Sequence, residues 1–276
     1  MKTVEAFAPA KINLTLHVTG QRNDGLHLLD SLVVFGDIGD RITVSPASAS
    51  RLTVSGPMAK GVPVDGGNLV LRAAELIGVT ADIHLKKYLP VAAGLGGGSS
   101  DAAATLRALS TMSGKPMPDI DAVLTLGADV PLCLHPTPTR MRGIGDLLQR
   151  QTVPQDVHLI LINPGQPVST GAVFQGLLQK YSAPMDAAPD PTGPNWMDWL
   201  KAQRNDLERP AIALQPVIAK VLTALRELPG CQLARMSGSG ATCFAILQEA
   251  GVPHRSVASL KRAFPEGWIQ LCRLKP

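Results

Sequence analysis

The stretch PVAAGLGGGSSDAAATL, residues 90–106, decides how the rest of the chain is interpreted. It places four glycines within five positions and follows them with two serines, an aspartate and a run of small residues. Glycine has no Cβ, so its backbone N–H groups can approach an anion closely and its φ can be positive. Ahead of a helix, such N–H groups add to the positive end of the helix dipole. The stretch therefore predicts a phosphate-binding loop.

Other interpretations of this loop fit less well. A flexible turn would not need so many glycines, and a Walker A loop would need a lysine that the stretch lacks. Gly94, Gly96 and Ser99 imitate the spacing of a dinucleotide-binding fingerprint, with Asp119 downstream, but no second βαβ half follows. A dinucleotide-binding oxidoreductase remains the alternative from a different class.

Composition narrows the class of protein. The chain has 276 residues, 45% of them hydrophobic and 17% charged, which is enough for one large domain or two ordinary ones. The net charge of +4 is spread without a basic run, so no nucleic-acid partner is expected. The four cysteines show no C-x-x-C spacing, and no apolar run approaches the length of a membrane span. We expect a cytoplasmic protein with no membrane partner and no protein-bound metal.

Periodicity predicts an α+β fold. Polar and apolar residues alternate strictly from Lys11 to Thr19, which indicates a half-buried strand. Further strands are expected at 41–45, 51–55 and 81–87. Asn68 is placed to cap one helix, and Ala102, Leu106 and Leu109 mark a second helix after the glycines. Strands followed by helices are typical of an α+β domain.

The second half begins near residue 150, which predicts domains at 1–150 and 151–276. Its expected elements, in chain order, are a strand at 157–162, a helix at 170–180, a proline-rich surface loop at 182–194, a helix at 216–227, two strands flanking SGSG, a helix through Val257, Leu260 and Phe264, and a strand at 268–274. Together they predict a small α/β sandwich.

Two charged residues are candidates for chemistry. Lys11 shares a strand face with Asn13, although a lysine in such a place is usually solvated. Asp129, in LGADVPLCL at 126–134, carries its charge toward apolar surroundings, where a carboxylate needs a partner. A turn or capping role is the alternative for this aspartate. SGSG at 237–240 on its own predicts only a tight hairpin.

Five blocks, in this order and spacing, resemble the GHMP kinase superfamily. They are PAKINLTLHVTGQRNDGLH at 9–27, LPVAAGLGGGSSDAAATL at 89–106, LGADVPLCL at 126–134, GIGD at 143–146 and SGSGATCFA at 237–245. The resemblance implies a two-domain fold, with an N-terminal α+β domain and a C-terminal ferredoxin-like α/β sandwich. It also implies ATP-dependent phosphorylation of a hydroxyl on a small molecule, the cytidine diphosphate-linked methylerythritol, with Mg²⁺ accompanying ATP. The state implied is a monomer or a weak homodimer.

The resemblance assigns roles to particular residues. Asp129 would take or orient the hydroxyl proton, and Lys11 would keep Asp129 ionised. The ATP phosphates would be wrapped by Pro90, Val91, Ala92, Ala93, Gly94, Leu95, Gly96, Gly97, Gly98, Ser99 and Ser100. The hydroxyls of Ser99 and Ser100 are expected to reach phosphate oxygens or Mg²⁺.

The cytidine diphosphate part would be contacted by Asn13, His27, Thr170 and Phe174, with the base stacked on Phe174. One position departs from the family pattern, because Leu26 stands where DGYH would place a tyrosine. Either weaker cytidine binding or compensation by another residue is the expected result. The remaining alternatives are a GHMP kinase for a phosphomevalonate-like or homoserine-like acceptor and a catalytically silent homologue.

Overall fold

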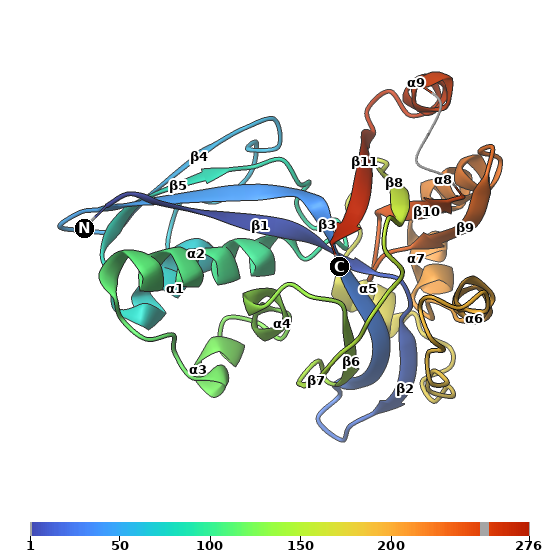
Figure 1. The fold of residues 1–276 in the computed structure, drawn as a ribbon, viewed down its shortest axis with the longest axis horizontal. Helices are drawn as coiled ribbons and strands as arrows, with labels where there is room; N and C mark the ends of the chain where they lie inside the picture. Colours follow the sequence, from blue (N-terminus) through green and yellow to red (C-terminus); the bar gives the residue numbers. More distant parts are fainter. Residues whose placement is uncertain (1, 249–253, 276) are drawn as a thin grey trace. The chain divides into compact units, whose positions relative to one another are not determined.

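The computed structural model describes residues 2–248 and 254–275, and its contacts divide the chain into two compact units (Figure 1). The first unit comprises Met1–Lys11, Ile38–Val91 and Gly96–Pro136, and the second comprises Ile12–Asp37, Ala92–Leu95 and Thr137–Pro276. Two strands, β1 (Val4–Asn13) and β3 (His27–Pro46), therefore contribute residues to both units. The predicted domain boundary near residue 150 stays a prediction.

In the first unit, β5 (Ala81–Lys86) lies between β4 (Arg51–Ser55) and the second half of β3. It pairs parallel with β4 and antiparallel with β3, where Ile42 lies opposite Leu85. Buried and exposed side chains alternate along β5, as its sequence predicts.

Four helices complete the first unit, α1 (Leu69–Ile77), α2 (Gly97–Ser113), α3 (Ile120–Leu124) and α4 (Val130–Leu134). Figure 1 shows α1 and α2 side by side, and α2 also packs against α4. The predicted cap of α1 is confirmed, because the Asn68 side chain accepts a hydrogen bond from the Val70 backbone at 2.9 Å. The apolar face predicted for α2 is buried at Ala102, Leu106 and Leu109.

In the second unit, β8 (His158–Asn163) is central and pairs antiparallel with β10 (Cys243–Leu247) and β11 (Trp268–Lys275). Beyond β10 lies β9 (Cys231–Met236). The first half of β3 pairs with β2 (His17–Gln21) and β6 (Thr139–Gly143), and β6 pairs with β7 (Leu147–Arg150).

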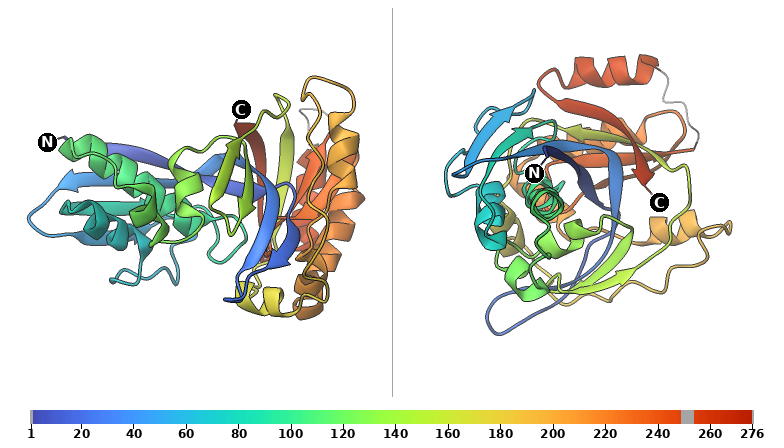
Figure 2. Two further views of the ribbon diagram at one scale, coloured as in Figure 1. Left: turned by 90° about the horizontal axis from the view of Figure 1, so that it is seen from below. Right: turned by 60° about the vertical axis from the view of Figure 1, so that its left-hand side comes forward.

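The helices of this unit are α5 (Thr170–Gln175), α6 (Trp196–Ala202), α7 (Glu208–Leu214), α8 (Val217–Arg226) and α9 (His254–Ala263). Figure 2 shows the orange helices against the orange and red strands. The core includes Ile160 and Ile162 of β8, Ile218 and Leu222 of α8, and Val18 of β2. The strands and the helix predicted at 157–162, 216–227 and 268–274 are confirmed.

The strand predicted at 11–19 differs from the structure. β1 ends at Asn13 and β2 begins at His17. Both faces are buried, because the polar side chains at Asn13, Thr15 and His17 are each at most 1% exposed. The cause lies far along the chain, where Leu16 exchanges backbone hydrogen bonds with Arg204 and Asp206. Local periodicity cannot reveal such distant cover.

Two further predictions need correction. The helix expected at 170–180 ends at Gln175. The proline-rich segment is a loop, but it is more than a surface excursion, because Met185 is only 4% exposed.

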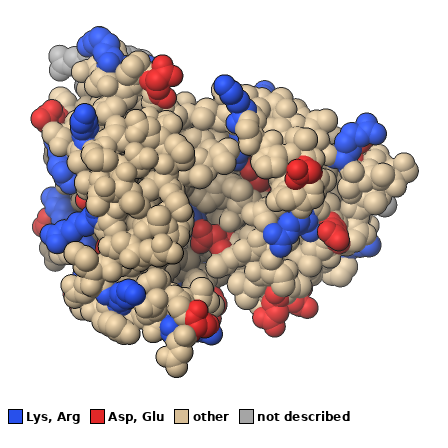
Figure 3. Space-filling model, turned by 180° about the vertical axis from the view of Figure 1, so that it is seen from behind, with Lys and Arg blue, Asp and Glu red and all other residues tan. Residues whose placement is uncertain are grey.

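One face of the molecule carries side chains of both charges, and the cysteines lie mostly in the interior. On the face drawn in Figure 3, Lys and Arg side chains are interspersed with Asp and Glu. The four cysteines form no disulfide with one another, and Cys133, Cys243 and Cys272 are buried. Within residues 2–248 and 254–275, no helix combines the length and apolar character needed to cross a bilayer.

Candidate active site

An ion pair in the first unit joins the two predicted catalytic residues. Lys11 Nζ, from β1, donates to Asp129 Oδ2 at 2.8 Å. The lysine side chain is 6% exposed and the aspartate side chain 34% exposed, so the carboxylate retains access to solvent. Asp129 stands at the start of α4, and Pro131 in the first turn of this helix favours helix initiation there. The structure thus brings together two residues 118 positions apart.

The glycine loop packs directly onto this pair. Gly96 precedes α2 with a left-handed backbone, φ 60°. A Cβ at Gly96 would lie 3.0 Å from both Cβ and Cε of Lys11, so only glycine fits without displacing the lysine. The first turn of α2 follows, with Gly98 exposed. Its free backbone N–H groups and bare surface suit the phosphates of a nucleotide.

The two serines of the loop differ in their surroundings. Ser100 is fully buried, and its hydroxyl donates to the Pro9 carbonyl at 2.8 Å. This hydrogen bond joins α2 to β1. The Ser100 hydroxyl proton is therefore not available to a phosphate oxygen. Ser99 is partly exposed and is the hydroxyl of the two that remains at the surface.

A buried charge cluster lies beneath the first turn of α2. Lys87 Nζ donates to Asp101 at 2.7 Å and also to Asp40. Asp40 further accepts the backbone N–H groups of Tyr88 and Leu89 at 2.5 and 2.9 Å. A Cβ at Gly97 would lie 3.1 Å from Lys87 Nζ, which places the cluster against the phosphate-binding turn. No sequence motif predicts these residues, and the one available signal is the charged Asp101 in an otherwise apolar helix.

Burial and the neighbouring charges shift the pKa values of Asp101 and Lys87 in this cluster. Desolvation raises the pKa of Asp101, and the nearby Asp40 adds to the effect. Burial alone would lower the pKa of Lys87, but its two carboxylate partners raise it above the ordinary value.

Arg107 fixes the position of α4. Its guanidinium donates to the carbonyls of Cys133 at 2.7 Å and Phe7 at 2.8 Å, which joins α2, α4 and β1. This arginine therefore holds the helix that begins at Asp129. Burial raises the pKa of the adjacent Cys133 thiol to about 12, so this cysteine is not a nucleophile at neutral pH.

In the second unit, the SGSG turn holds part of the glycine loop. Ser237 Oγ donates to the Gly94 carbonyl at 2.9 Å, and the Thr242 backbone donates to Ala93 at 3.1 Å. Gly94 has φ 73°, and a Cβ there would lie 2.3 Å from the Ser237 carbonyl oxygen. The hairpin predicted for SGSG thus also binds residues 92–95 through these hydrogen bonds.

The four predicted cytidine-contacting residues all belong to the second unit. The His27 and Phe174 rings stack with their centroids 4.8 Å apart, so part of the Phe174 ring is covered within the protein. Burial lowers the pKa of His27, and Lys180 lowers it further. His27 Nε2 is buried and has no hydrogen-bond partner among the described residues. Thr170 Oγ1 lies 2.8 Å from Ser239 Oγ of the SGSG turn.

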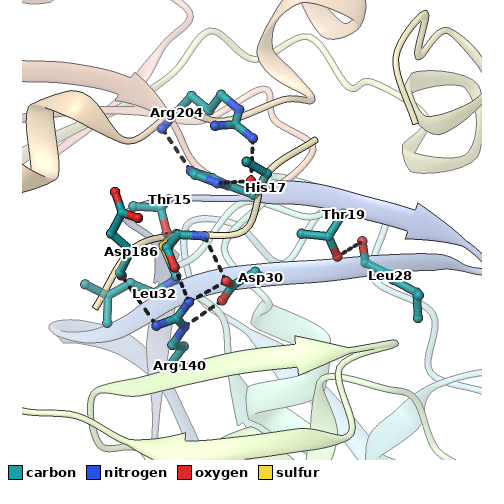
Figure 4. A network of polar contacts seen from close by, with 11 residues as sticks. Thr15, His17, Thr19, Leu28, Asp30, Leu32, Arg140, Asp186 and Arg204 are labelled. Carbon is teal, nitrogen blue, oxygen red and sulfur yellow. Dashed lines mark hydrogen bonds and ion pairs between the residues drawn. The ribbon is translucent and has the colours of Figure 1, made fainter. Parts of the chain in front are cut away.

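Residues 182–186, here called the strap, are bound to β2 and β3 (Figure 4). Asp30 is 1% exposed and accepts two hydrogen bonds from Arg140, at 2.8 and 2.6 Å. It also accepts the Met185 backbone N–H at 2.9 Å, while Arg140 donates to the Met185 carbonyl at 2.6 Å. This buried pair was not foreseen from the sequence, because its partners lie 110 positions apart.

His17 fastens the other end of the strap. Its Nδ1 lies 3.1 Å from the Ala183 carbonyl, and its Nε2 lies 3.3 Å from the Arg204 backbone nitrogen (Figure 4). The carbonyl can only accept and the backbone N–H can only donate, so His17 is neutral with its proton on Nδ1. Burial lowers the pKa of His17 accordingly.

Over the residues that the structure describes, no group of three or more His, Cys, Asp or Glu side chains is arranged to hold a metal ion.

Comparisons with known proteins agree with this geometry. Residues 68–147 match the N-terminal domain of the GHMP kinases, and residues 194–266 match their C-terminal domain. A 4-diphosphocytidyl-2-C-methyl-D-erythritol kinase of Ruegeria pomeroyi is 54% identical over 96% of this chain and 97% of its own length. A relative of the same name from Cereibacter sphaeroides is 51% identical over 98% of this chain and 99% of its own.

Solved structures give the same result. The crystal structure of a 4-(cytidine 5'-diphospho)-2C-methyl-D-erythritol kinase superimposes with a TM-score of 0.78 at 32% identity, covering 98% of this chain and 99% of that one. Homoserine kinase from Cytophaga hutchinsonii, at 18% identity and a TM-score of 0.67 over 99% of this chain and 96% of that one, shares the fold. The predicted fold class and kinase activity are confirmed, against the oxidoreductase alternative. The chain belongs to the GHMP kinase family, with the α+β fold and the N- and C-terminal domains of these small-molecule kinases.

Proposed function

We propose that this kinase transfers the γ-phosphate of ATP to the 2-hydroxyl of 4-diphosphocytidyl-2-C-methyl-D-erythritol, in isoprenoid precursor biosynthesis. The observation that carries the proposal is the Lys11–Asp129 ion pair at 2.8 Å, with Gly96 packed against the lysine. Relatives above 50% identity over nearly the whole chain support this acceptor over phosphomevalonate or homoserine.

The residues at the start of α2 fit a nucleotide triphosphate. Bare glycines and free N–H groups face an anion without a side chain in the way. ATP supplies the phosphoryl group, and Mg²⁺ would arrive with it, since the described residues offer no ready-made cage for the ion. Ser99, at the surface of the first turn, is the hydroxyl we assign to this site.

Asp129 and Lys11 divide the work on the acceptor hydroxyl. Asp129, ionised beside the lysine ammonium, accepts the hydroxyl proton or orients the hydroxyl for attack. The Lys11 ammonium offsets the charge of the transferring group and holds the carboxylate in one position. Phosphoryl transfer needs mainly positioning and charge stabilisation, so this pair and the loop are sufficient.

The cytidine diphosphate part is assigned to Asn13, His27, Thr170 and Phe174. The stacked rings of His27 and Phe174 offer an aromatic surface to the base. His27 is neutral, and its buried Nε2 is left over for a ligand. Leu26 precedes His27 in the sequence and is 49% exposed. Its aliphatic side chain cannot stack on the base as a tyrosine ring would.

A coupled assay of ADP release tests the proposal. The purified chain is given ATP and Mg²⁺ with the cytidine substrate, phosphomevalonate or homoserine at equal concentrations. We expect the highest kcat/KM with the cytidine substrate by a wide margin. Preference for either other acceptor overturns the substrate assignment, and absence of turnover with all three supports the silent-homologue alternative. A cytoplasmic location and a monomeric or weakly dimeric state stay predictions.

A further inference from the structure

The side chain of Asn13 is held in one orientation with one atom left over. Asn13 is 1% exposed, and its Nδ2 donates to Ser31 Oγ at 2.7 Å. Its Oδ1 is buried and has no hydrogen-bond partner among the described residues. A buried acceptor without a partner is energetically unfavourable, so it marks a place where a ligand donor is expected.

Ser31 decides which end of the amide faces it. The Ser31 hydroxyl has one proton, and that proton goes to the Thr15 carbonyl at 2.5 Å. The Ser31 oxygen can then only accept, and only the NH₂ end of Asn13 can donate to it. Asn13 Oδ1 is therefore forced to the opposite side. The amide orientation follows from the hydrogen-bond network.

Thr15 is held as firmly as Ser31. It is fully buried, and its Oγ1 accepts the Leu32 backbone N–H at 2.8 Å and donates to Met185 Sδ at 2.8 Å (Figure 4). The chain of contacts thus runs from the strap through Thr15 and Ser31 to Asn13. All of these residues belong to the second unit.

The backbone beside the free oxygen is fixed and bare. The Asn13 backbone N–H donates to Ser237 Oγ at 3.1 Å. Gly238 has φ 57°, and a Cβ there would lie 3.4 Å from Asn13 Oδ1. Glycine at this position means that residue 238 places no side chain against the oxygen.

We infer that Ser31 is a positioning residue, which turns Asn13 so that its Oδ1 accepts a hydrogen bond from a hydroxyl of the polyol part of the acceptor substrate. This inference moves Asn13 from the cytidine diphosphate part, to which the resemblance assigned it, to the neighbouring polyol. The inference rests on the proposed function for the identity of that substrate. A hydroxyl is the fitting donor because Asn13 follows Lys11 by two residues in the sequence, whereas the aromatic surface for the base is built by His27 and Phe174.

A double-mutant cycle tests the inference. Ser31→Ala should lower kcat/KM for the cytidine substrate about tenfold to a hundredfold, because the amide loses its orientation, and should leave the KM for ATP unchanged. Asn13→Ala should show a similar loss, and adding Ser31→Ala to it should cost nothing more. Ser31→Thr, which keeps the hydroxyl, should restore most of the activity.

Thr139→Ala is the matched control. Thr139 is 4% exposed, lies on the neighbouring β6 and donates to the Thr137 carbonyl at 2.9 Å, with no link to Asn13. It should lower thermal stability as much as Ser31→Ala does and leave kcat/KM within about twofold of the parent. Independent losses from Asn13→Ala and Ser31→Ala, or wild-type kcat/KM in Ser31→Ala, would overturn the inference.

A readout without turnover separates the inference from the proposed function. The ¹⁵N side-chain amide signal of Asn13 is identified by its disappearance in Asn13→Ala. Its protons should exchange slowly with solvent in the parent and in Ser31→Thr, and quickly in Ser31→Ala. Equal exchange rates in the three proteins would overturn the inference that Ser31 orients Asn13, whatever the substrate is. Inactive parent protein with the expected exchange would instead count against the substrate assignment alone.

Discussion

Among single residues, the carboxylate of Asp129 carries the sharpest prediction. Asp129→Asn keeps the shape but removes the proton acceptor and the charge that pairs with Lys11. Turnover should fall by roughly 10²–10⁴, with the KM for ATP close to that of the parent. Asp119→Asn is the control, because Asp119 also precedes a short helix and Asn caps equally well. Near-parental turnover in Asp129→Asn would remove this residue from the chemistry.

The exposed Leu26 carries a prediction of the opposite sign. Leu26→Tyr should lower the KM for the cytidine substrate, since stacking of a base on an aromatic ring contributes about 1–3 kcal/mol. The change is measured by steady-state kinetics at saturating ATP. Leu26→Ala serves as the comparison, because it alters the same exposed side chain without adding a ring. An unchanged or higher KM in the tyrosine variant would show that the base lies elsewhere.

Among the elements, the contact between the glycine loop and the SGSG turn leaves no room for an added side chain at Gly94. Gly94→Ala would force a Cβ to within 2.3 Å of the Ser237 carbonyl at a positive φ. We expect a loss of about 1–3 kcal/mol in the free energy of unfolding and a higher KM for ATP. Gly66→Ala is the control, with nothing within 4 Å of its new Cβ. Equal stability and equal ATP kinetics in both variants would show that the contact between Gly94 and the SGSG turn does not hold the loop in place.

The elements also show what the sequence could predict. α1, β5, α8 and β11 were predictable because their patterns are local and regular. No regular spacing predicts α4 within the apolar run after Asp129, and α6 and α7 are only seven residues each and follow a proline-rich segment. Such short helices depend on tertiary packing more than on propensity.

The site divides in the same way. Lys11, Asp129 and the loop were predictable because their motifs resemble those of a family, and the resemblance assigns residues far apart in the sequence to one site. The Lys87–Asp40–Asp101 cluster and the Asp30–Arg140 pair have no local pattern, and each joins residues from separate strands or helices. Pairing of this kind depends on tertiary structure, so the sequence alone did not reveal it.

For the molecule as a whole, the interleaving of the two units predicts how fragments behave. A fragment of residues 151–276 lacks β2, β6 and the first half of β3, and with them Leu16 and Val18 of the second core. It should show no cooperative thermal transition by circular dichroism, whereas the full chain should. A cooperative transition in the fragment would mean that residues 151–276 form a domain without the N-terminal strands.

Stability of the whole chain should also depend on pH through His17, which is buried, and His27, which is partly buried. Burial lowers the pKa of both His17 and His27 below 6.5. As the pH falls below about 6.5, these histidines take up protons in the unfolded chain that they resist in the folded chain, so their contribution to the free energy of unfolding should decrease from pH 7.5 toward pH 5. The raised pKa of Asp101 acts in the opposite direction, so the histidine contribution is read from a variant. Denaturant titrations at several pH values measure the slope.

His17→Gln is the variant that isolates one contribution. Glutamine can donate to the Ala183 carbonyl and accept from the Arg204 backbone without titrating. Its unfolding free energy should therefore vary less between pH 7.5 and pH 5 than that of the parent. An identical slope in both proteins would show that His17 does not contribute.

The contact between Gly96 and the aliphatic part of Lys11 has an evolutionary consequence. No Cβ fits at position 96 while a long side chain occupies position 11 in this pose, although 85 positions separate the two in the sequence. A lineage that abandoned the lysine would lose the selection that keeps the glycine bare, and a descendant with any bulkier residue at 96 would have to move the ammonium first. The two codons are expected to drift together, so the glycine serves as a historical record of whether its distant neighbour is still in use.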